Sequence, residues 1–256
     1  MSSTKLTRGS GPAESRAPLR VESRLLAERR RLLRLAAWLG VGSSARGLLA
    51  SPSPTPPEGV EMDLAAFVRE AVPLAEALLA DKSRLGQDRY LHTIAALAVR
   101  LRDVPLPEMR ETSKDSKART FLGAHEFEAP FTILHWRLEP GARIGLHPHI
   151  YGNVVTLCLG GEVHIENYEM VNERDFDRAE PFEVRRTHDQ ILLPGDINLV
   201  SLEHSYVHGF VAGPEGAQGL DITTRIRDKR PTPTLIVSPQ AIDAERRIFE
   251  GRWQKA

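Results

Sequence analysis

The sequence contains very little cysteine, no excess charge of either sign and no long apolar run. Its one cysteine, Cys158, cannot form a disulfide within the chain, which excludes a fold held together by disulfide bonds. Lysine plus arginine and aspartate plus glutamate both number 34, so the basic footprint of a nucleic-acid-binding protein is missing. No run of roughly 18 apolar residues occurs, as a membrane-spanning helix requires. We therefore expect neither a nucleic-acid partner nor a membrane span.

Residues 1–58 are predicted to form a disordered leader that ends in a proline-rich linker. The first twenty residues are polar and rich in serine, glycine and proline, a composition typical of disorder. Arginines between Arg29 and Arg34 then precede a mildly apolar stretch, which resembles a bacterial twin-arginine export signal. The same stretch also fits a basic amphipathic helix ending at Gly47. The protein is accordingly either cytoplasmic or exported, and both alternatives stay open. SPSPTPP, at 51–57, is a stiff, extended linker.

Residues 59–118 are predicted to form a helical segment that packs on a neighbouring sheet or on a second subunit. Apolar residues recur there at spacings of three and four, which indicates amphipathic helices. Pro73 is expected to kink the first helix or to lie in a break near it. The two apolar stripes comprise Leu64, Phe67, Val68, Ala71, Leu74 and Leu78, and Leu91, Ile94, Leu97, Ala98 and Leu101.

From about Thr120 the hydrophobic pattern changes to short segments rich in β-branched residues and separated by glycine and proline. Several short strands at this spacing favour a β-sandwich or barrel, so the predicted fold class is mainly β, with the barrel over residues 119–227. Residues 228–256 are predicted to be a C-terminal extension. Its last part, AIDAERRIFEGRWQ at 241–254, is predicted to form a short helix.

Two histidines in PGARIGLHPHIYGN, residues 140–153, suggest a metal site. On a strand, His147 and His149 would project from the same face, and Pro148 between them fits an edge or a bend. Two imidazoles on one face can hold a divalent metal, provided that another strand supplies a third ligand. His208 is the candidate for that ligand. His204, four residues earlier, is the alternative.

The spacing of these residues resembles the first motif of the cupin superfamily, in which two histidines, a glutamate and two glycines recur at fixed intervals. Pro194, Gly195 and His208 resemble the second cupin motif with a longer gap. The resemblance covers residues 119–227 and implies a single double-stranded β-helix barrel, of the cupin or jelly-roll type, with a metal inside. The positions that match the first motif are Gly141, His147, His149, Asn153 and Gly160, with Asn153 in place of the usual glutamate.

Within the cupins, an all-histidine site without the glutamate resembles the thiol dioxygenases, such as the cysteine and cysteamine dioxygenases. This resemblance implies Fe(II), a thiol and O₂, with the thiol oxidised to a sulfinate. The thiol would be a cysteine-like small molecule or an N-terminal cysteine. Three neutral ligands leave Fe(II) its full charge, which favours an incoming thiolate. The alternative is a metal-binding cupin of another class, either a different small-molecule enzyme or a non-catalytic binding module.

A second similarity concerns the substrate. ARTFLGAHEFEAPFTILHW, residues 118–136, resembles the part of the small-molecule cysteine dioxygenases that ends in an apolar strand and a tryptophan. In those enzymes an arginine upstream of the tryptophan binds the substrate carboxylate, and counting back from Trp136 the matching residue is Arg119. A solvated arginine in a linker is the alternative interpretation. Tyr151 is the other predicted substrate contact.

The remaining predictions concern neighbours of the site. His204, Tyr206 and Asn153 are expected to surround the metal with hydrogen bonds, and no catalytic side chain is expected beyond the metal site. Val154 occupies the position of the cysteine that is cross-linked to a tyrosine in some thiol dioxygenases, and Cys158 is expected to be a small buried apolar residue. The histidines interpreted as structural or exposed are His125, His135, His164 and His188.

Overall fold

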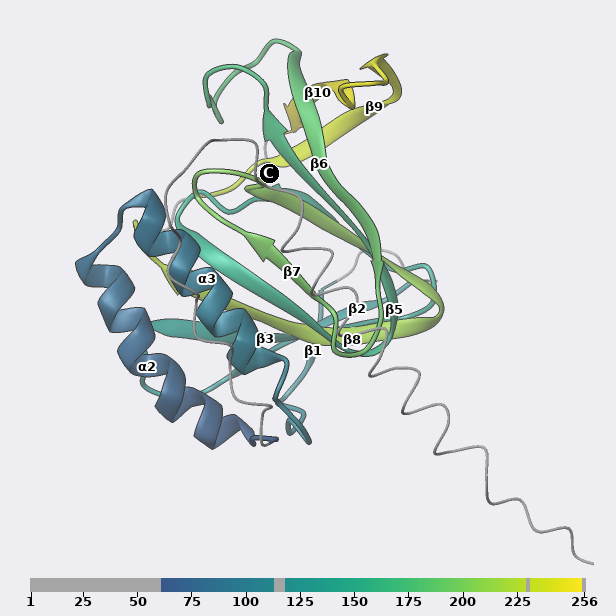
Figure 1. The fold of residues 1–256 in the computed structure, drawn as a ribbon. Helices are drawn as coiled ribbons and strands as arrows, with labels where there is room; N and C mark the ends of the chain where they lie inside the picture. The colour runs from purple at the N-terminus through teal and green to yellow at the C-terminus, as the bar shows by residue number, and fades with distance from the viewer. Residues whose placement is uncertain (1–60, 113–117, 229–230, 255–256) are drawn as a thin grey trace, which may run out of the picture. The chain divides into compact units, whose positions relative to one another are not determined.

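The computed structural model describes residues 61–112, 118–228 and 231–254 (Figure 1). The predicted leader, export signal and proline-rich linker at 1–58 lie outside the described residues. Among the residues that are described, no helix is long and apolar enough to cross a membrane.

Two antiparallel helices make up the predicted helical segment, α2 (Leu64–Ala80) and α3 (Arg84–Ala98). Each begins at a side-chain cap, because Asp63 and Ser83 accept hydrogen bonds from backbone N–H groups of the first turn. Of the two alternatives for Pro73, a break is wrong, since α2 includes this proline and continues to Ala80. Residues of the apolar stripes join a single hydrophobic cluster with residues of the sheet.

The rest of the described chain is built from strands. In chain order they are β1 (Arg110–Glu111), β2 (Thr120–His125), β3 (Phe131–Leu138), β4 (Arg143–Pro148), β5 (Gly152–Met170), β6 (Phe182–Leu192), β7 (Ile197–Val200), β8 (Val207–Arg225), β9 (Thr234–Asp243) and β10 (Ile248–Gln254).

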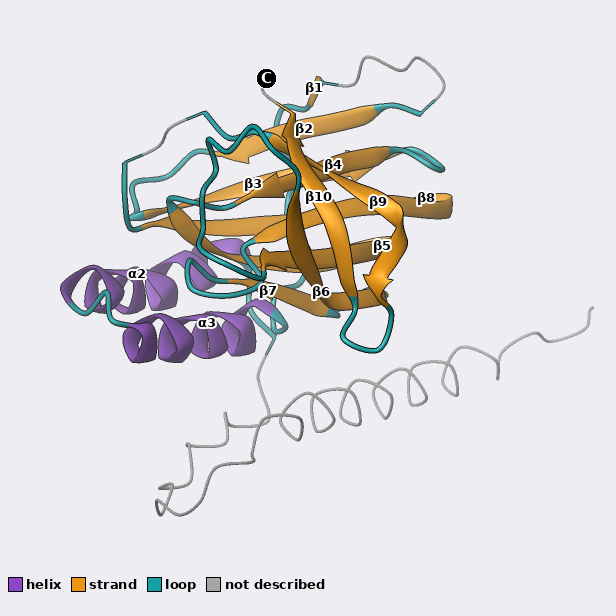
Figure 2. Ribbon diagram, turned by 90° about the horizontal axis from the view of Figure 1, so that it is seen from above, coloured by secondary structure: helices purple, strands orange, loops and turns teal. Residues whose placement is uncertain are grey.

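All strands pair antiparallel in one sheet, in the order β1-β2-β3-β8-β5-β6-β10-β9, with β4 also beside β8 and β7 also beside β5. The long strands β5 and β8 run the length of the molecule and exchange partners midway. Where the first half of β5 pairs with the second half of β8, the outer neighbours are β7 and β3. Where the second half of β5 pairs with the first half of β8, the outer neighbours are β6 and β4. The sheet therefore curls on itself (Figure 2), which confirms the predicted mainly β, double-stranded β-helix class with its helical segment.

The curl depends on a bend in β5 and β8 where the pairing register shifts. Gly161 and Gly216 face each other at this bend with φ angles of 69° and 76°, a region that favours glycine. A Cβ atom on Gly161 would lie 2.1 Å from the carbonyl oxygen of Gly216, so the two strands approach too closely for any side chain. Glycine at both positions lets two long strands serve both halves of the barrel.

Alternation along these strands separates two faces. Leu220 and Ile222 of β8 pack under the helices. Ala217, in the opposite phase, belongs to the core inside the curled sheet together with Trp136. Phe210 belongs to the same core, because the pairing register shifts between it and Ala217. Because His208 shares the phase of Phe210, its side chain belongs to the inside face. The interior of the barrel is therefore where the candidate ligands should meet.

The short helix predicted for residues 241–254 is wrong, because the chain forms the β9–β10 hairpin and β10 pairs with β6. Burial along β10 explains the difference. Trp253 belongs to an apolar cluster with Phe182, and Phe249 packs against it, while Glu250 and Arg252 are exposed. Tertiary pairing with an available sheet edge thus overrode a local pattern that also fits a helix.

Candidate metal centre

The structure brings His147, His149 and His208 together. His147 of β4 is the register partner of His208 of β8, so the antiparallel ladder sets these two imidazoles side by side. His149 follows directly after β4, and its backbone N–H donates to the carbonyl of Tyr206, just before β8. Two neighbouring strand ends therefore hold three imidazoles drawn from positions 61 residues apart at most.

The three rings present the same atom to one another. The Nε2 atom of His149 lies 2.8 Å from that of His208 and 3.1 Å from that of His147. A neutral imidazole has one N–H and one lone pair, and the Nδ1 atom of His147 lies 2.9 Å from the Gly145 carbonyl, where it donates. The ring hydrogen atoms therefore cannot satisfy the contact of His147 with Gly145 and both contacts of His149 with the other imidazoles. A cation among the Nε2 lone pairs would, so the residues present fit a metal.

Burial keeps this cluster neutral. It lowers the pKa of His147, and it lowers those of His149 and His208 well below the usual histidine value, with a further lowering from neighbouring imidazoles. His149 and His208 are buried, whereas His147 is partly exposed. Neutral imidazoles are the form that ligates metals. The group of three contains no carboxylate.

The orientation of His147 is fixed by its bond to Gly145, as is usual for a metal-binding histidine. The Nδ1 atoms of His149 and His208 are buried and have no hydrogen-bond partner among the described residues. Their rings are held by packing instead: His208 stacks edge-on against Phe210, with ring centroids 4.7 Å apart.

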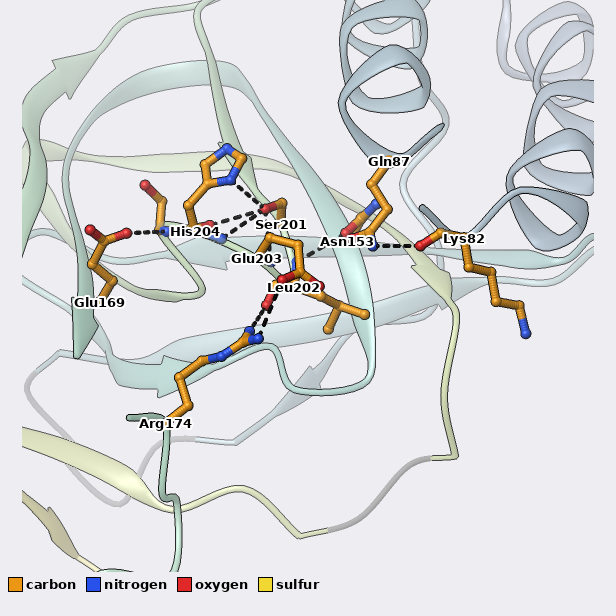
Figure 3. A network of polar contacts seen from close by, with 10 residues as sticks. Lys82, Gln87, Asn153, Glu169, Arg174, Ser201, Leu202, Glu203 and His204 are labelled. Atoms are coloured by element: carbon orange, nitrogen blue, oxygen red, sulfur yellow. Dashed lines mark hydrogen bonds and ion pairs between the residues drawn. The ribbon is translucent and has the colours of Figure 1, made fainter. Parts of the chain in front are cut away.

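His204 lies apart from this cluster, because β8 begins only at Val207 and His204 is in the preceding turn. Its Nδ1 atom contacts the Ser201 hydroxyl at 3.1 Å (Figure 3). Its Nε2 atom is 4.0 Å from Asp88. The prediction that it shares a face with His208 assumed a regular strand. The turn removes that periodicity, so His208 is the third imidazole that the structure offers.

Asn153 faces the helices rather than the barrel interior. Its side-chain oxygen accepts a hydrogen bond from the Leu202 backbone N–H (Figure 3), and Leu202 belongs to the helix-facing cluster. Its register partner is Thr224, whose hydroxyl bonds to Tyr90 of α3. The inward position is that of the next residue, Val154. The structure thus puts an apolar side chain, and no acid, where β5 faces the interior.

The two tyrosines differ in their relation to the histidines. The Tyr151 ring lies 6.2 Å from the His149 ring between centroids, and partial burial raises the pKa of its hydroxyl. The buried Tyr206 hydroxyl accepts a hydrogen bond from the Met170 N–H, within an apolar cluster. Tyr206 therefore supports the site through its backbone carbonyl, which orders His149. Only Tyr151 brings a side chain near the imidazoles.

Arg119 is engaged in ion pairs on an exposed strand edge. Its guanidinium donates to Glu139 at 2.5 Å, reaches Glu111 at 4.0 Å and lies over the Phe121 ring. Glu139 raises the pKa of Arg119 further. Among the described residues its contacts are these, and none is with the three histidines. A carboxylate-binding role would require an exchange of partners that the structure does not favour.

Asp221 is an interior acid that the sequence analysis overlooked. It is 6% exposed and lies on β8 in the phase opposite to Leu220 and Ile222, hence on the interior face. The Thr156 hydroxyl donates to it at 2.6 Å. Burial raises the pKa of Asp221 to about 7, and its charge raises the pKa of Tyr151, which links it to the histidine side of the barrel. An acid within an otherwise apolar alternating strand, GLDITTR, was the available signal.

A second group with metal-binding residue types lies on the outer surface. His164 and Asp189 bond to each other at 2.7 Å, while Arg186 contacts both Glu166 and Asp189. The arginine already neutralises these carboxylates. This group therefore looks like a surface ion-pair network rather than a metal site.

No protein-family model matches the sequence, and a comparison with curated proteins gives no match. Solved structures do resemble the fold. KdgF from Halomonas sp. has 18% identity over 46% of this chain and 88% of its own, with a TM-score of 0.32. A Klebsiella pneumoniae subsp. pneumoniae protein with a double-stranded β-helix domain has 19% identity over 45% and 82%, also with a TM-score of 0.32. An oxalate oxidase has 10% identity over 39% and 44%, with a TM-score of 0.30. Similarity at this level concerns the arrangement of strands only.

Proposed function

We propose that the protein is an Fe(II)-dependent dioxygenase that oxidises a thiol to a sulfinate. The observation that carries this proposal is the convergence of three neutral imidazoles, His147, His149 and His208, without a carboxylate. Such a donor set keeps the full double charge of a bound Fe(II), which favours an anionic thiolate as the next ligand. When bound, iron would supply the activation of O₂ and the ordering of both reactants.

The reaction balances with O₂ as the only co-reactant. R–SH and O₂ give R–SO₂H: both oxygen atoms bond to sulfur, sulfur loses four electrons, and O₂ gains the same four. No external reductant is needed. The protein has to bind the thiol, hold it beside the three imidazoles and exclude water, as the apolar side chains of Val154 and Phe210 on the interior face allow.

Asp221 and Tyr151 are the groups that we propose to contact the rest of the substrate. A carboxyl group with a pKa of about 7 can accept a hydrogen bond or, when protonated, donate one. Its negative form attracts an amino group and repels a carboxylate. We therefore favour thiols that carry an amino group, such as cysteamine or an N-terminal cysteine, over 3-mercaptopropionate. Arg119, held by Glu139, keeps no substrate role in this proposal.

The alternative is a metal-binding cupin of another class, either another small-molecule enzyme or a binding module. The same three imidazoles would also accept other divalent metals, and fold alone does not distinguish the functions. A different metal after purification, together with no thiol oxidation, would favour it.

The test combines metal analysis with O₂ consumption. Anaerobically purified protein is loaded with Fe(II), its iron content is measured, and O₂ uptake is recorded with cysteamine, a peptide with N-terminal cysteine, cysteine and 3-mercaptopropionate. We expect uptake that matches sulfinate formation mole for mole, fastest with the amino thiols. Protein with a full complement of iron and no uptake with any thiol would contradict the proposal. Arg119→Ala serves as a control variant outside the site.

A further inference from the structure

A second pair of histidines, the buried His135 and the half-buried His125 on the helix-facing side of the sheet, has buried ring nitrogens without hydrogen-bond partners among the described residues. His135 of β3 is 2% exposed, and neither of its ring nitrogens has a partner among the described residues. His125 of β2 lies beside it, with ring centroids 5.8 Å apart, and its Nε2 atom is likewise buried without a partner. Three of the four ring nitrogens are thus unpaired, a cost that native structures normally avoid.

The strand position next to both imidazoles is covered by a thioether. Gly123 is the register partner of His135 and lies two residues from His125, so all three share one face of the sheet (Figure 2 shows β1, β2 and β3 side by side). A Cβ atom built on Gly123 would lie 2.7 Å from the Met109 sulfur and 2.5 Å from the Glu108 carbonyl oxygen. The missing side chain at Gly123 therefore lets the chain before β1 descend onto the sheet. The Met109 sulfur therefore lies over Gly123, the strand position that neighbours both histidines.

The ring separation suits a shared ion. A metal bonds to an imidazole nitrogen at about 2.0 to 2.1 Å, so the centroids of two rings on one ion lie no more than about 6.5 Å apart. The 5.8 Å between His125 and His135 is within this limit. The sulfur of the partly exposed Met109, which lies against Gly123, is the candidate third donor.

The charges around the pair select the kind of ion. Burial lowers the pKa of both imidazoles, that of His135 to about 4, so both are neutral donors. Arg137 and the rings themselves are the charged or titratable groups that act on His135, and no carboxylate is among them. Hard divalent ions prefer oxygen ligands, whereas thioether and imidazole together suit a soft ion of low charge. The neighbouring guanidinium also repels a cation, and it repels a doubly charged ion more strongly than a singly charged one.

We propose that Met109, His125 and His135 form a binding site for Cu(I), on the opposite face of the sheet from His147, His149 and His208. The site does not depend on the function proposed for that cluster, because it shares no residue with it. A bound ion would give the buried His135 and the half-buried His125 the partner that their ring nitrogens lack among the described residues.

The test is an anaerobic Cu(I) titration of the full chain after the three-histidine cluster has been loaded with Zn(II). Bathocuproine disulfonate serves as the competing chelator, and metal analysis follows zinc retention. We expect one equivalent of Cu(I) bound without zinc release, and a sulfur neighbour at about 2.3 Å in the copper X-ray absorption spectrum. Cu(I) uptake that only displaces zinc, or no uptake, would overturn the proposal.

Variants identify the ligands. Met109→Leu should remove the sulfur neighbour and weaken Cu(I) binding by at least about tenfold, a factor typical of a lost metal contact. Met170→Leu, in a separate buried cluster, is the matched control and should change neither quantity. His135→Leu should abolish binding. If the sulfur neighbour persists in Met109→Leu, the ligand is another sulfur, such as the buried thiol of Cys158, and the assignment is wrong.

Discussion

Replacing Asp221 with asparagine should stabilise the protein at alkaline pH and have much less effect in acid. Burial raises the pKa of this carboxyl from its ordinary value of 3.8 to about 7 in the folded state. The folded protein therefore prefers the neutral carboxyl, whereas the unfolded chain ionises it from about pH 4 upward. The free energy of unfolding consequently falls as pH rises between these two values and stays low above the higher one.

The magnitude follows from the two pKa values. A difference of about three units corresponds to on the order of 4 kcal/mol lost once both states are ionised, at about 1.4 kcal/mol per unit. At pH 5 only about 1.5 kcal/mol of this is lost, because the folded carboxyl is still protonated. Asparagine keeps an oxygen that can accept from the Thr156 hydroxyl but cannot ionise. The stabilisation by Asp221→Asn should therefore be larger at pH 8 than at pH 5 by about 2 to 3 kcal/mol.

Urea unfolding of both proteins at pH 5 and pH 8, with EDTA present, measures this difference. The chelator is needed because metal bound to the native state would add its own stabilisation. Thr156→Val is a control: it removes the hydroxyl that lowers the pKa of Asp221, so it should make the pH dependence steeper. An equal effect of Asp221→Asn at both pH values would show that the carboxyl is solvated, and the interior placement of Asp221 would then be wrong.

Three further outcomes are expected. His208→Ala should weaken binding of the divalent metal by more than roughly 100-fold, whereas His204→Ala should leave it nearly unchanged, as equilibrium dialysis with metal analysis would show; the reverse would mean that the turn residue is the ligand. Arg119→Ala should change kcat/KM for any thiol substrate by less than about threefold. A large rise in KM confined to carboxylate-bearing thiols would instead show that Arg119 binds the substrate carboxylate. Gly161→Ala should cost at least about 2 kcal/mol in urea unfolding, because alanine is strained at this φ and meets Gly216; no loss would mean that the bend can relax.

The parts of the fold that were predictable are those with a local signature. The stripes through Phe67 and Ile94 indicated helices with one apolar face, and the alternation at the histidine pair indicated a strand. His147 and His149 could be placed on one face from their spacing alone. No local pattern connects these two residues with His208, which lies far along the chain. The three imidazoles come together through the register between β4 and β8, which only the tertiary structure gives.

The failures have identifiable physical causes. His204 and the C-terminal segment were assigned from a regular period from which the chain departs, whereas Asn153 was assigned from its match to a motif position. A turn before Val207 removes His204 from the strand, and the phase of β5 directs Asn153 towards the helices. In the C-terminal segment, contact with the edge of β6 outweighs local preference. Asp221 was overlooked because its role depends on burial, which one sequence does not reveal.

The shared strands β5 and β8 also determine when the barrel can fold. β3, β4 and β5 all pair with β8, so three earlier strands lack a neighbour until residues 207–225 are available. Contacts this distant in sequence make folding slow. A chain that ends before Val207 should therefore leave the β3 and β4 edges unpaired and prone to association. Because His208 arrives on that same last barrel strand, a metal held by all three imidazoles would bind only the closed form and would favour closure.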